Sequence, residues 1–384
     1  MPRTKSMIPV VSSDESVQPR GRGPREGVAL CLSGGGYRAM LFHAGALWAL
    51  NHHGRLATLD LISSVSGGSI TAAWLGLRWK NLDFDDTSTA KNFEDEVVRP
   101  LRRLAAKTVD RQAVLEGLVS AEGRGQPLVD AYRERLFGTA TLQDLPERPE
   151  IVINATNVQS GALFRFSKRF LWDYRVGRVS RPATSIAEAA GASSAFPPLL
   201  SPVTLTLSHG SFDENTGKDL QRPPFTRRVV LTDGGVYDNL GIESGWKRYK
   251  TILVSDAGAK LEPEGHPRED LLRHSLRVLG IVDDQVRNLR KRQLIAAYRL
   301  GERSGAYWGI RSDLGHFDVH RPLPCPAERT MKLARMATRL EAIGELTQKR
   351  LINWGFAVCD AATRRHVDRG LQAPAEFPYP GARV

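Results

Sequence analysis

The first 80 residues alternate between short apolar runs and turns of small residues, and this alternation restricts the fold more than any other feature of the sequence. Residues 28–32 are continuously apolar and end in glycines, which is typical of a buried parallel strand. An apolar helix is predicted over 39–50, a second strand over 59–65 and a second helix over 70–79. This order predicts a parallel sheet with helices on its faces.

Later parts of the chain continue the α/β pattern. The sequence predicts strands at 150–157, 163–166 (as a hairpin partner of the preceding strand), 229–232 and 251–256, and helices at 185–195, 275–300 and 330–353. Gly355 is expected to end the last of these helices. No repeat or clear linker divides the chain, so we expect one domain over residues 27–384.

Three segments outside this pattern carry separate expectations. Residues 1–26 are polar, basic and interrupted by prolines, and are predicted to form a flexible leader. Residues 81–148 are mainly helical in pattern and form either a helical cap, acting as a lid over a site, or a connecting layer. Residues 373–384 are predicted to be an irregular tail.

Composition narrows the class of protein. The formal net charge of +12 favours contact with anionic phospholipid, nucleic acid or acidic partners, or is simply a solvated basic surface. No apolar stretch is long enough to span a bilayer, and the N-terminus lacks the apolar core of a signal peptide. The three cysteines are far apart and show no metal-binding spacing. We therefore expect a cytoplasmic protein with no metal and no other cofactor.

The glycine loop after the first predicted strand is suited to hold negative charge. Gly34, Gly35 and Gly36 let backbone amides point at one place, and the following helix adds the positive end of its dipole. Such a loop binds a phosphate or the oxyanion of a transition state. Arg38 is placed to add a bidentate phosphate contact.

Two alternatives remain for this loop. Gly34, Gly36 and Ala39 also satisfy the dinucleotide-binding fingerprint, which needs an acidic residue at the end of the next strand. Asp60 has about the right spacing but stands at the start of that strand. The loop is otherwise a purely structural tight turn.

A serine follows the second predicted strand on a turn of small residues. Ser66 has Gly68 two positions later, as the strand-to-helix turn of a nucleophile requires, but Ser64 stands where the usual pattern has glycine. The alternative is that Ser66 or Ser69 simply caps the next helix.

An aspartate is the candidate partner of this serine. Asp233 follows an apolar strand, at the sheet edge where ligands bind, and a buried carboxylate there can take a serine proton. Alternatively, Asp233 and its two glycines form an ordinary turn. No histidine after Asp233 has motif-like surroundings, and His43 is expected to be packed in the core. We expect a Ser–Asp dyad.

With these motifs in place, the sequence resembles the patatin-like phospholipases, and more distantly the cytosolic phospholipase A group. The matching segments are residues 32–40, 64–69, 192–198 and 233–239, and the resemblance covers about residues 27–260. It implies a three-layer α/β/α domain with a mostly parallel central sheet.

The resemblance also implies roles for residues. Ser66 would be the nucleophile, Asp233 its base, and the amides of Gly34, Gly35 and Gly36 the oxyanion hole. Arg38 matches an arginine that the cytosolic group uses near a lipid phosphate. Two features depart from the family: Ser64 in place of glycine, and no lipid-targeting domain ahead of the catalytic one.

The sequence as a whole predicts a serine-dependent lipid acyl hydrolase, a carboxylic ester hydrolase of the phospholipase A or lysophospholipase kind. Its substrate would be a lipid or phospholipid, with peripheral contact to an anionic membrane and no nucleic-acid partner. In the predicted helix 275–300, Arg287, Arg290, Lys291 and Arg292 form either a lipid-facing surface or a solvated one. The alternative function is a weakly catalytic or non-catalytic module that binds a membrane or a partner on the same fold.

Overall fold

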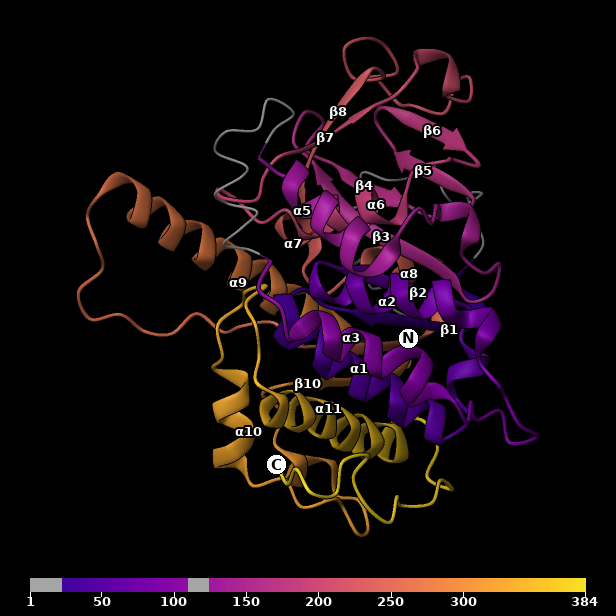
Figure 1. Ribbon diagram of the computed structural model, residues 1–384, viewed down its shortest axis with the longest axis vertical. Helices are drawn as coiled ribbons and strands as arrows, with labels where there is room; N and C mark the ends of the chain where they lie inside the picture. The colour runs from indigo at the N-terminus through magenta and orange to yellow at the C-terminus, as the bar shows by residue number, and fades with distance from the viewer. Residues whose placement is uncertain (1–22, 110–123) are drawn as a thin grey trace, which may run out of the picture.

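The computed structural model describes residues 23–109 and 124–384 and is built around one large mixed sheet (Figure 1). Five strands form its parallel part, in spatial order β10 (Ser304–Gly309), β9 (Tyr249–Asp256), β1 (Arg25–Leu32), β2 (Leu61–Val65) and β3 (Glu150–Asn157). The parallel sheet predicted from the first 80 residues is therefore confirmed.

Antiparallel strands extend the sheet beyond β3. The hairpin predicted after β3 is present, and it continues as a meander of β4 (Leu163–Phe166), β5 (Phe170–Asp173) and β6 (Gly177–Ser180). The far end of β3 also pairs with β8 (Arg228–Asp233), which in turn pairs with β7 (Val203–Thr206). Strand β8 carries Asp233 to the same edge of the sheet at which β2 ends.

The alternation of side chains along β1 explains the three layers. Leu30 and Leu32 belong to the larger core cluster, whereas Ala29 and Cys31 belong to a second cluster on the opposite face. Helices α1 (Gly36–His52), α2 (Gly67–Arg78) and α11 (Glu345–His366) cover the first face. Helices α8 (Glu243–Trp246) and α9 (Leu271–Arg299) cover the second (Figure 1). The fold is a three-layer α/β/α sandwich, as expected.

The prediction that Gly355 ends a helix is wrong. Helix α11 runs through Gly355 because this residue lies where α11 crosses α1: a Cβ at Gly355 would stand 1.9 Å from the Phe42 carbonyl oxygen. Gly45 of α1 is equally crowded, with a Cβ 1.9 Å from the Ile352 carbonyl oxygen. The two glycines permit the close crossing of the helices rather than breaking either one.

The predicted helix 330–353 is in fact two helices, since α10 (Ala327–Ala334) ends before α11 begins. The described parts of residues 81–148 contain the π-helix Glu94–Val98, α3 (Arg99–Ala105), α5 (Gln126–Tyr132) and the π-helix Arg133–Phe137. Helix α3 packs on α1, and α5 packs on α6 (Ile186–Ser194). Residues 110–123 lie outside the described part, so a lid here stays a prediction.

The remaining elements are short. The 3-10 helices are Leu56–Thr58, Trp79–Asn81, Leu142–Asp144, His209–Ser211 and Leu314–Phe317, and α7 (Gly235–Asp238) is one turn long. Residues 1–22 of the predicted leader lie outside the described residues, and Arg25 and Glu26 already belong to β1. Residues 373–384 contain neither helix nor strand.

Candidate active site

The turn between β2 and α2 holds Ser66 in an uncommon backbone conformation. Its φ is 50° and its ψ is −122°, a region that residues with a side chain rarely adopt. Ser66 occupies the N-cap position of α2, but its side chain makes no capping hydrogen bond. The helix-cap alternative is therefore wrong for this serine, and a sharp strand-to-helix elbow is found in its place.

Asp233 lies at the end of β8, and the amide of Gly235 donates to its Oδ1 at 2.7 Å. Burial, which leaves Asp233 only 3% exposed, raises its pKa to about 7. The Gly235 amide and the neighbouring Ser66 side chain, which is within hydrogen-bonding reach of the carboxylate, both lower this pKa. The negative charge of Asp283 raises this pKa further.

The glycine loop lies directly against the elbow. A Cβ on Gly34 would stand 3.2 Å from the Cβ of Ser66, and a Cβ on Gly67 would stand 2.1 Å from the carbonyl oxygen of Gly36. Gly36 itself has a φ of 59°. Glycine is therefore required on both sides of this contact, and the sequence motifs 34–36 and 64–68 form one continuous structure.

The three loop amides are not equivalent. The amide of Gly34 donates to the carbonyl oxygen of Asn239 and to its Oδ1, each at 3.1 Å. Within the described residues, the amides of Gly35 and Gly36 make no hydrogen bond. The amides of Gly35 and Gly36 are thus free to form the predicted oxyanion hole, whereas the amide of Gly34 is already bonded to Asn239. The sequence analysis did not identify Asn239 as a partner of the loop.

A network of buried hydroxyl groups holds the elbow in place and explains why serine is tolerated at position 64. Ser64 Oγ donates to the Val152 carbonyl oxygen at 3.2 Å and accepts from Ser69 Oγ at 3.1 Å. Ser193 Oγ lies 2.9 Å from Ser69 Oγ and accepts the Ser66 amide at 2.9 Å. The Ser64 hydroxyl therefore both donates and accepts a hydrogen bond within the core, and its side chain does not crowd the turn.

Arg38 is not directed at an open site in this structure. Its guanidinium is almost fully buried and donates to the carbonyl oxygen of Ala257 at 2.8 Å, to that of Met336, and to Thr338 Oγ1 at 3.1 Å. Burial lowers the pKa of Arg38 to about 10. These contacts fix the glycine loop to the C-terminal part of the chain, and the phosphate contact of Arg38 stays a prediction.

His43 is a core residue, as expected. It is fully buried, its Nδ1 lies 2.8 Å from Ser255 Oγ, and its Nε2 lies 2.9 Å from the carbonyl oxygen of Ser33. Burial lowers its pKa to about 4, so the ring is neutral at physiological pH. It supports the strand that precedes the glycine loop.

The dinucleotide alternative does not fit the position of Asp60. This residue precedes β2, at the amino edge of the sheet, where it accepts the Val28 amide at 2.9 Å and pairs with Arg148 at 2.8 Å. A ribose-binding carboxylate has to stand at the opposite edge.

Two arginines predicted for a lipid-facing or solvated surface on α9 are used inside the protein. Arg287 pairs with Asp284 at 2.9 Å, and Arg290 pairs with Glu243 at 3.0 Å and Asp238 at 3.5 Å. Both predicted surfaces are wrong for these two residues: Arg287 is buried and paired within α9, and Arg290 anchors the middle of α9 to α7 and α8.

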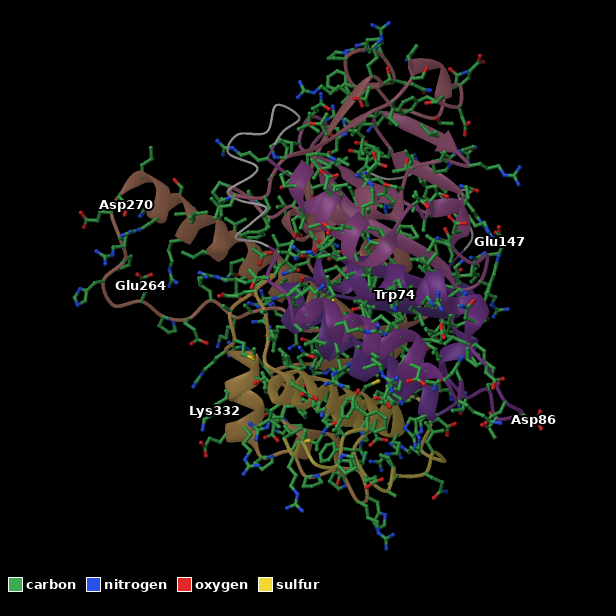
Figure 2. The ribbon with its side chains drawn as sticks, viewed as in Figure 1. Trp74, Asp86, Glu147, Glu264, Asp270 and Lys332 are labelled. Carbon is green, nitrogen blue, oxygen red and sulfur yellow. The ribbon has the colours of Figure 1, made fainter. Side chains whose placement is uncertain are left out.

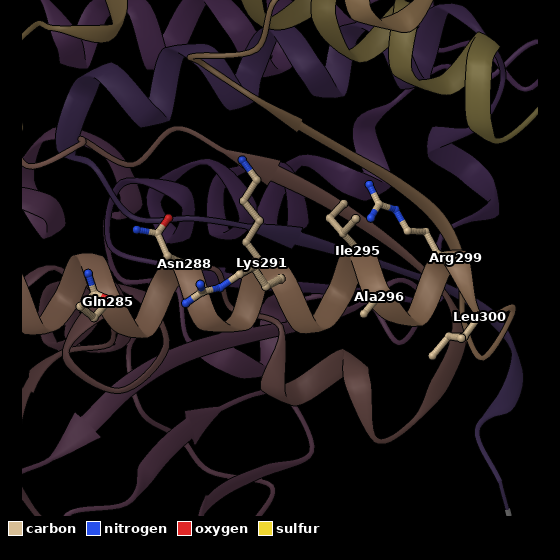
Figure 3. Close-up of a pocket in the computed structure, with 8 residues that line it drawn as sticks. Gln285, Asn288, Lys291, Ile295, Ala296, Arg299 and Leu300 are labelled. Carbon is tan, nitrogen blue, oxygen red and sulfur yellow. The ribbon is translucent and has the colours of Figure 1, made fainter. Parts of the chain in front are cut away.

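A groove of about 870 Å³ runs along the C-terminal half of α9 and is lined by residues that include Lys291, Arg292 and Arg299 (Figure 3). Neither Ser66 nor Asp233 lines it. Across the described ranges, no group of three or more His, Cys, Asp or Glu side chains is arranged to hold a metal ion. No helix in the described part of the chain is long and apolar enough to cross a membrane.

Comparison with known families identifies the class. The patatin-like phospholipase family matches residues 30–246, which include the glycine loop, the elbow and the Asp233 turn. The chain belongs to the patatin-like phospholipase family. No curated protein matches it.

The solved structures that match this chain are remote in sequence. Human GIVD cytosolic phospholipase A2 is 14% identical, with 88% of this chain and 58% of that chain covered and a TM-score of 0.49. VipD from Legionella pneumophila is 15% identical over 80% and 66%, with a TM-score of 0.31. ExoU from Pseudomonas aeruginosa, in complex with SpcU, is 17% identical over 71% and 53%, with a TM-score of 0.25. The chain thus spans less than two thirds of the human enzyme.

Proposed function

We propose that this protein is a serine-dependent lipid acyl hydrolase of the phospholipase A or lysophospholipase kind, acting through a Ser66–Asp233 dyad. The observation that carries the proposal is Ser66 on a strained elbow, within hydrogen-bonding reach of the buried Asp233 carboxylate, whose pKa is raised to about 7. A carboxylate with such a pKa is basic enough to accept a proton and is still ionised in a large fraction of molecules at neutral pH. Family membership supports the same chemistry.

Each step of the reaction has a group to perform it. Ser66 Oγ attacks the ester carbonyl carbon while its proton passes to the Asp233 carboxylate. The amides of Gly35 and Gly36 hold the oxyanion of the tetrahedral intermediate. When the intermediate collapses, the C–O bond to the alcohol breaks and Asp233 returns the proton to the leaving oxygen. Water then attacks the acyl-Ser66 ester while Asp233 accepts its proton. The bond between the acyl carbon and Ser66 Oγ breaks, Asp233 returns the proton to Oγ, and the fatty acid is released.

The test compares Ser66→Ala and Asp233→Asn with the parent on a soluble nitrophenyl ester and on phospholipid vesicles. We expect each variant to lose at least about 1,000-fold in kcat/KM, because nucleophile and base act as one unit. Ser211→Ala, which removes an exposed hydroxyl far along the chain, is the matched control and should leave the rate unchanged. Parent-like rates in Ser66→Ala would remove this serine from the mechanism.

Labelling with a fluorophosphonate separates the proposal from the non-catalytic alternative. The reagent should modify the parent at Ser66 and leave Ser66→Ala unmodified. A parent protein that resists the reagent would instead support a binding module that retains the fold.

A further inference from the structure

The N-terminal half of α9 projects from the molecule instead of packing on it. Figure 1 shows residues 271–282 and the preceding loop extending away from the sandwich, and Asp270 and Glu264 mark the end of this projection in Figure 2. With a rise of about 1.5 Å per residue, the helix reaches about 18 Å beyond Asp283. Arg290 of α9 pairs with Asp238 of α7, the short helix that follows Asp233, so the packed half of α9 lies beside the candidate site.

This projecting segment is unusually apolar for an exposed helix. Of the fourteen large apolar side chains that are exposed among the described residues, six belong to it: Leu271, Leu276, Val278, Leu279, Ile281 and Val282. With residues placed about 100° apart around the axis, these six occupy an arc of about 220°. A soluble surface seldom carries so many large apolar side chains on one short segment unless it meets a partner.

The opposite, polar arc of the same segment is already covered. Arg277 donates to the carbonyl oxygen of Glu262 at 2.8 Å and pairs with Glu264 at 3.7 Å. The side chain of Leu261 lies 3.2 Å from where a Cβ on Gly280 would stand. The loop before α9 therefore supports one side of the helix and leaves the apolar arc bare.

Apolar exposure continues to the mouth of the candidate site. Phe196, which is 60% exposed, follows the residue whose carbonyl oxygen accepts the Asp233 amide. Val236, which is also exposed, follows Gly235, whose own amide binds the Asp233 carboxylate. Exposed apolar side chains thus stand beside the candidate site as well as on α9.

Charge on the remainder of α9 indicates what covers this arc. Arg292 and Arg299 are exposed, and no ion pair is found for either within the described ranges. Both lie within about 20° of Ile281 around the helix axis, so they continue the line of one edge of the apolar arc. Leucine, valine and isoleucine on one segment with arginine beyond them suit the acyl and phosphate layers of an anionic membrane, as does the net charge of +12.

We infer that the apolar arc of α9, residues 271–282, inserts into the surface of an anionic phospholipid membrane and brings the Ser66 site to it. This deepens the proposed function and rests on it for the nature of the substrate. Two other partners could cover the apolar arc in place of a membrane: a second copy of this chain, or residues 1–22.

The experiment measures vesicle binding without turnover. Full-length Ser66→Ala protein is sedimented with vesicles of phosphatidylcholine and phosphatidylserine. Two further proteins carry Ser66→Ala together with a second substitution. In one it is Leu279→Glu, in the apolar arc, and in the other it is Leu346→Glu, at the start of α11. The two leucines are similarly exposed, at 55% and 50%. We expect Leu279→Glu to weaken vesicle partitioning at least about tenfold, because it places a charge where the leucine would insert into the membrane. Leu346→Glu should have no effect on partitioning.

Three results would overturn the inference: a Ser66→Ala protein that stays in the supernatant, equal sedimentation of the two leucine variants, or a dimer by light scattering that Leu279→Glu dissociates without changing vesicle binding. Because the assay needs no catalysis, its outcome is independent of the proposed function. An inactive parent that binds vesicles through α9 would refute the hydrolase alone, and an active parent that does not bind them would refute only the docking surface.

Discussion

The two longest helices of this protein, α9 and α11, are used in opposite ways. Helix α11 is buried almost continuously from Leu351 to Arg364 and crosses α1 with backbone atoms nearly in contact. Helix α9 packs on the sheet only through its second half, where Leu294 is fully buried, and its first half is exposed. The comparison separates a helix that is fixed in the core from one whose first half is left exposed.

The largest expected effect tests this contrast with the same substitution in each helix. Gly355→Ala forces a Cβ into the backbone of α1 and should lower the free energy of unfolding by about 3 kcal/mol. Gly280→Ala meets only the flexible end of Leu261, so the better helix propensity of alanine should leave stability unchanged or raise it by up to about 1 kcal/mol. Urea unfolding measures both. Equal losses in the two variants would remove the distinction between the helices.

Gly355 also shows where sequence reasoning fails. A glycine near the end of an apolar pattern predicts a helix end, because the sequence does not reveal a second helix crossing at that point. Strand β10 was missed for a related reason: it contains two glycines and little alternation, and it is held by pairing with β9. Strand β1 was predictable because residues 28–32 are a continuous apolar run that ends in small residues.

The residues of the candidate site likewise fall into those that the sequence predicted and those that it did not. Ser66, Asp233 and the glycine loop stand in local motifs that a single sequence displays. Asn239 lies within a segment that resembles the family, but its bond to Gly34 joins residues 205 positions apart, and no local pattern encodes it. Asp283 belongs to α9, outside every motif, and only the packing of that helix brings it near Asp233.

A second prediction concerns how α9 is anchored where it leaves the sheet. Arg290→Met would leave the buried Asp238 without its cation and should lower stability by about 2 kcal/mol at pH 8. Arg273→Met, on the projecting half, removes only a long, exposed pair and should change stability by less than about 0.5 kcal/mol.

The pH dependence of the Arg290→Met effect follows from Asp238. Burial already raises the pKa of Asp238, and Arg290 lowers it. Without Arg290 the folded-state pKa rises further above the unfolded value, so stability is retained at low pH and lost as the pH rises. The difference from the parent should therefore be smaller at pH 5 than at pH 8. A difference that does not grow with pH would mean that Arg290 acts through packing rather than charge.

The smallest expected effect asks whether α9 also tunes the proposed chemistry. Asp283→Asn removes a negative charge that raises the pKa of Asp233, so this pKa should fall by a fraction of a unit, on the order of the shifts that single partly buried charges produce. Because Asp233 has to be ionised to accept the Ser66 proton, the acid limb of the kcat/KM profile on a soluble ester should move to lower pH. The neighbouring Asp284→Asn is the control, since Asp284 pairs with Arg287 and does not act on Asp233. Asparagine at 283 can still accept the hydrogen bond from Asn239, so the loop contact at Gly34 should be kept. An unchanged profile in both Asp283→Asn and Asp284→Asn would mean that α9 positions the site without contributing to its electrostatics.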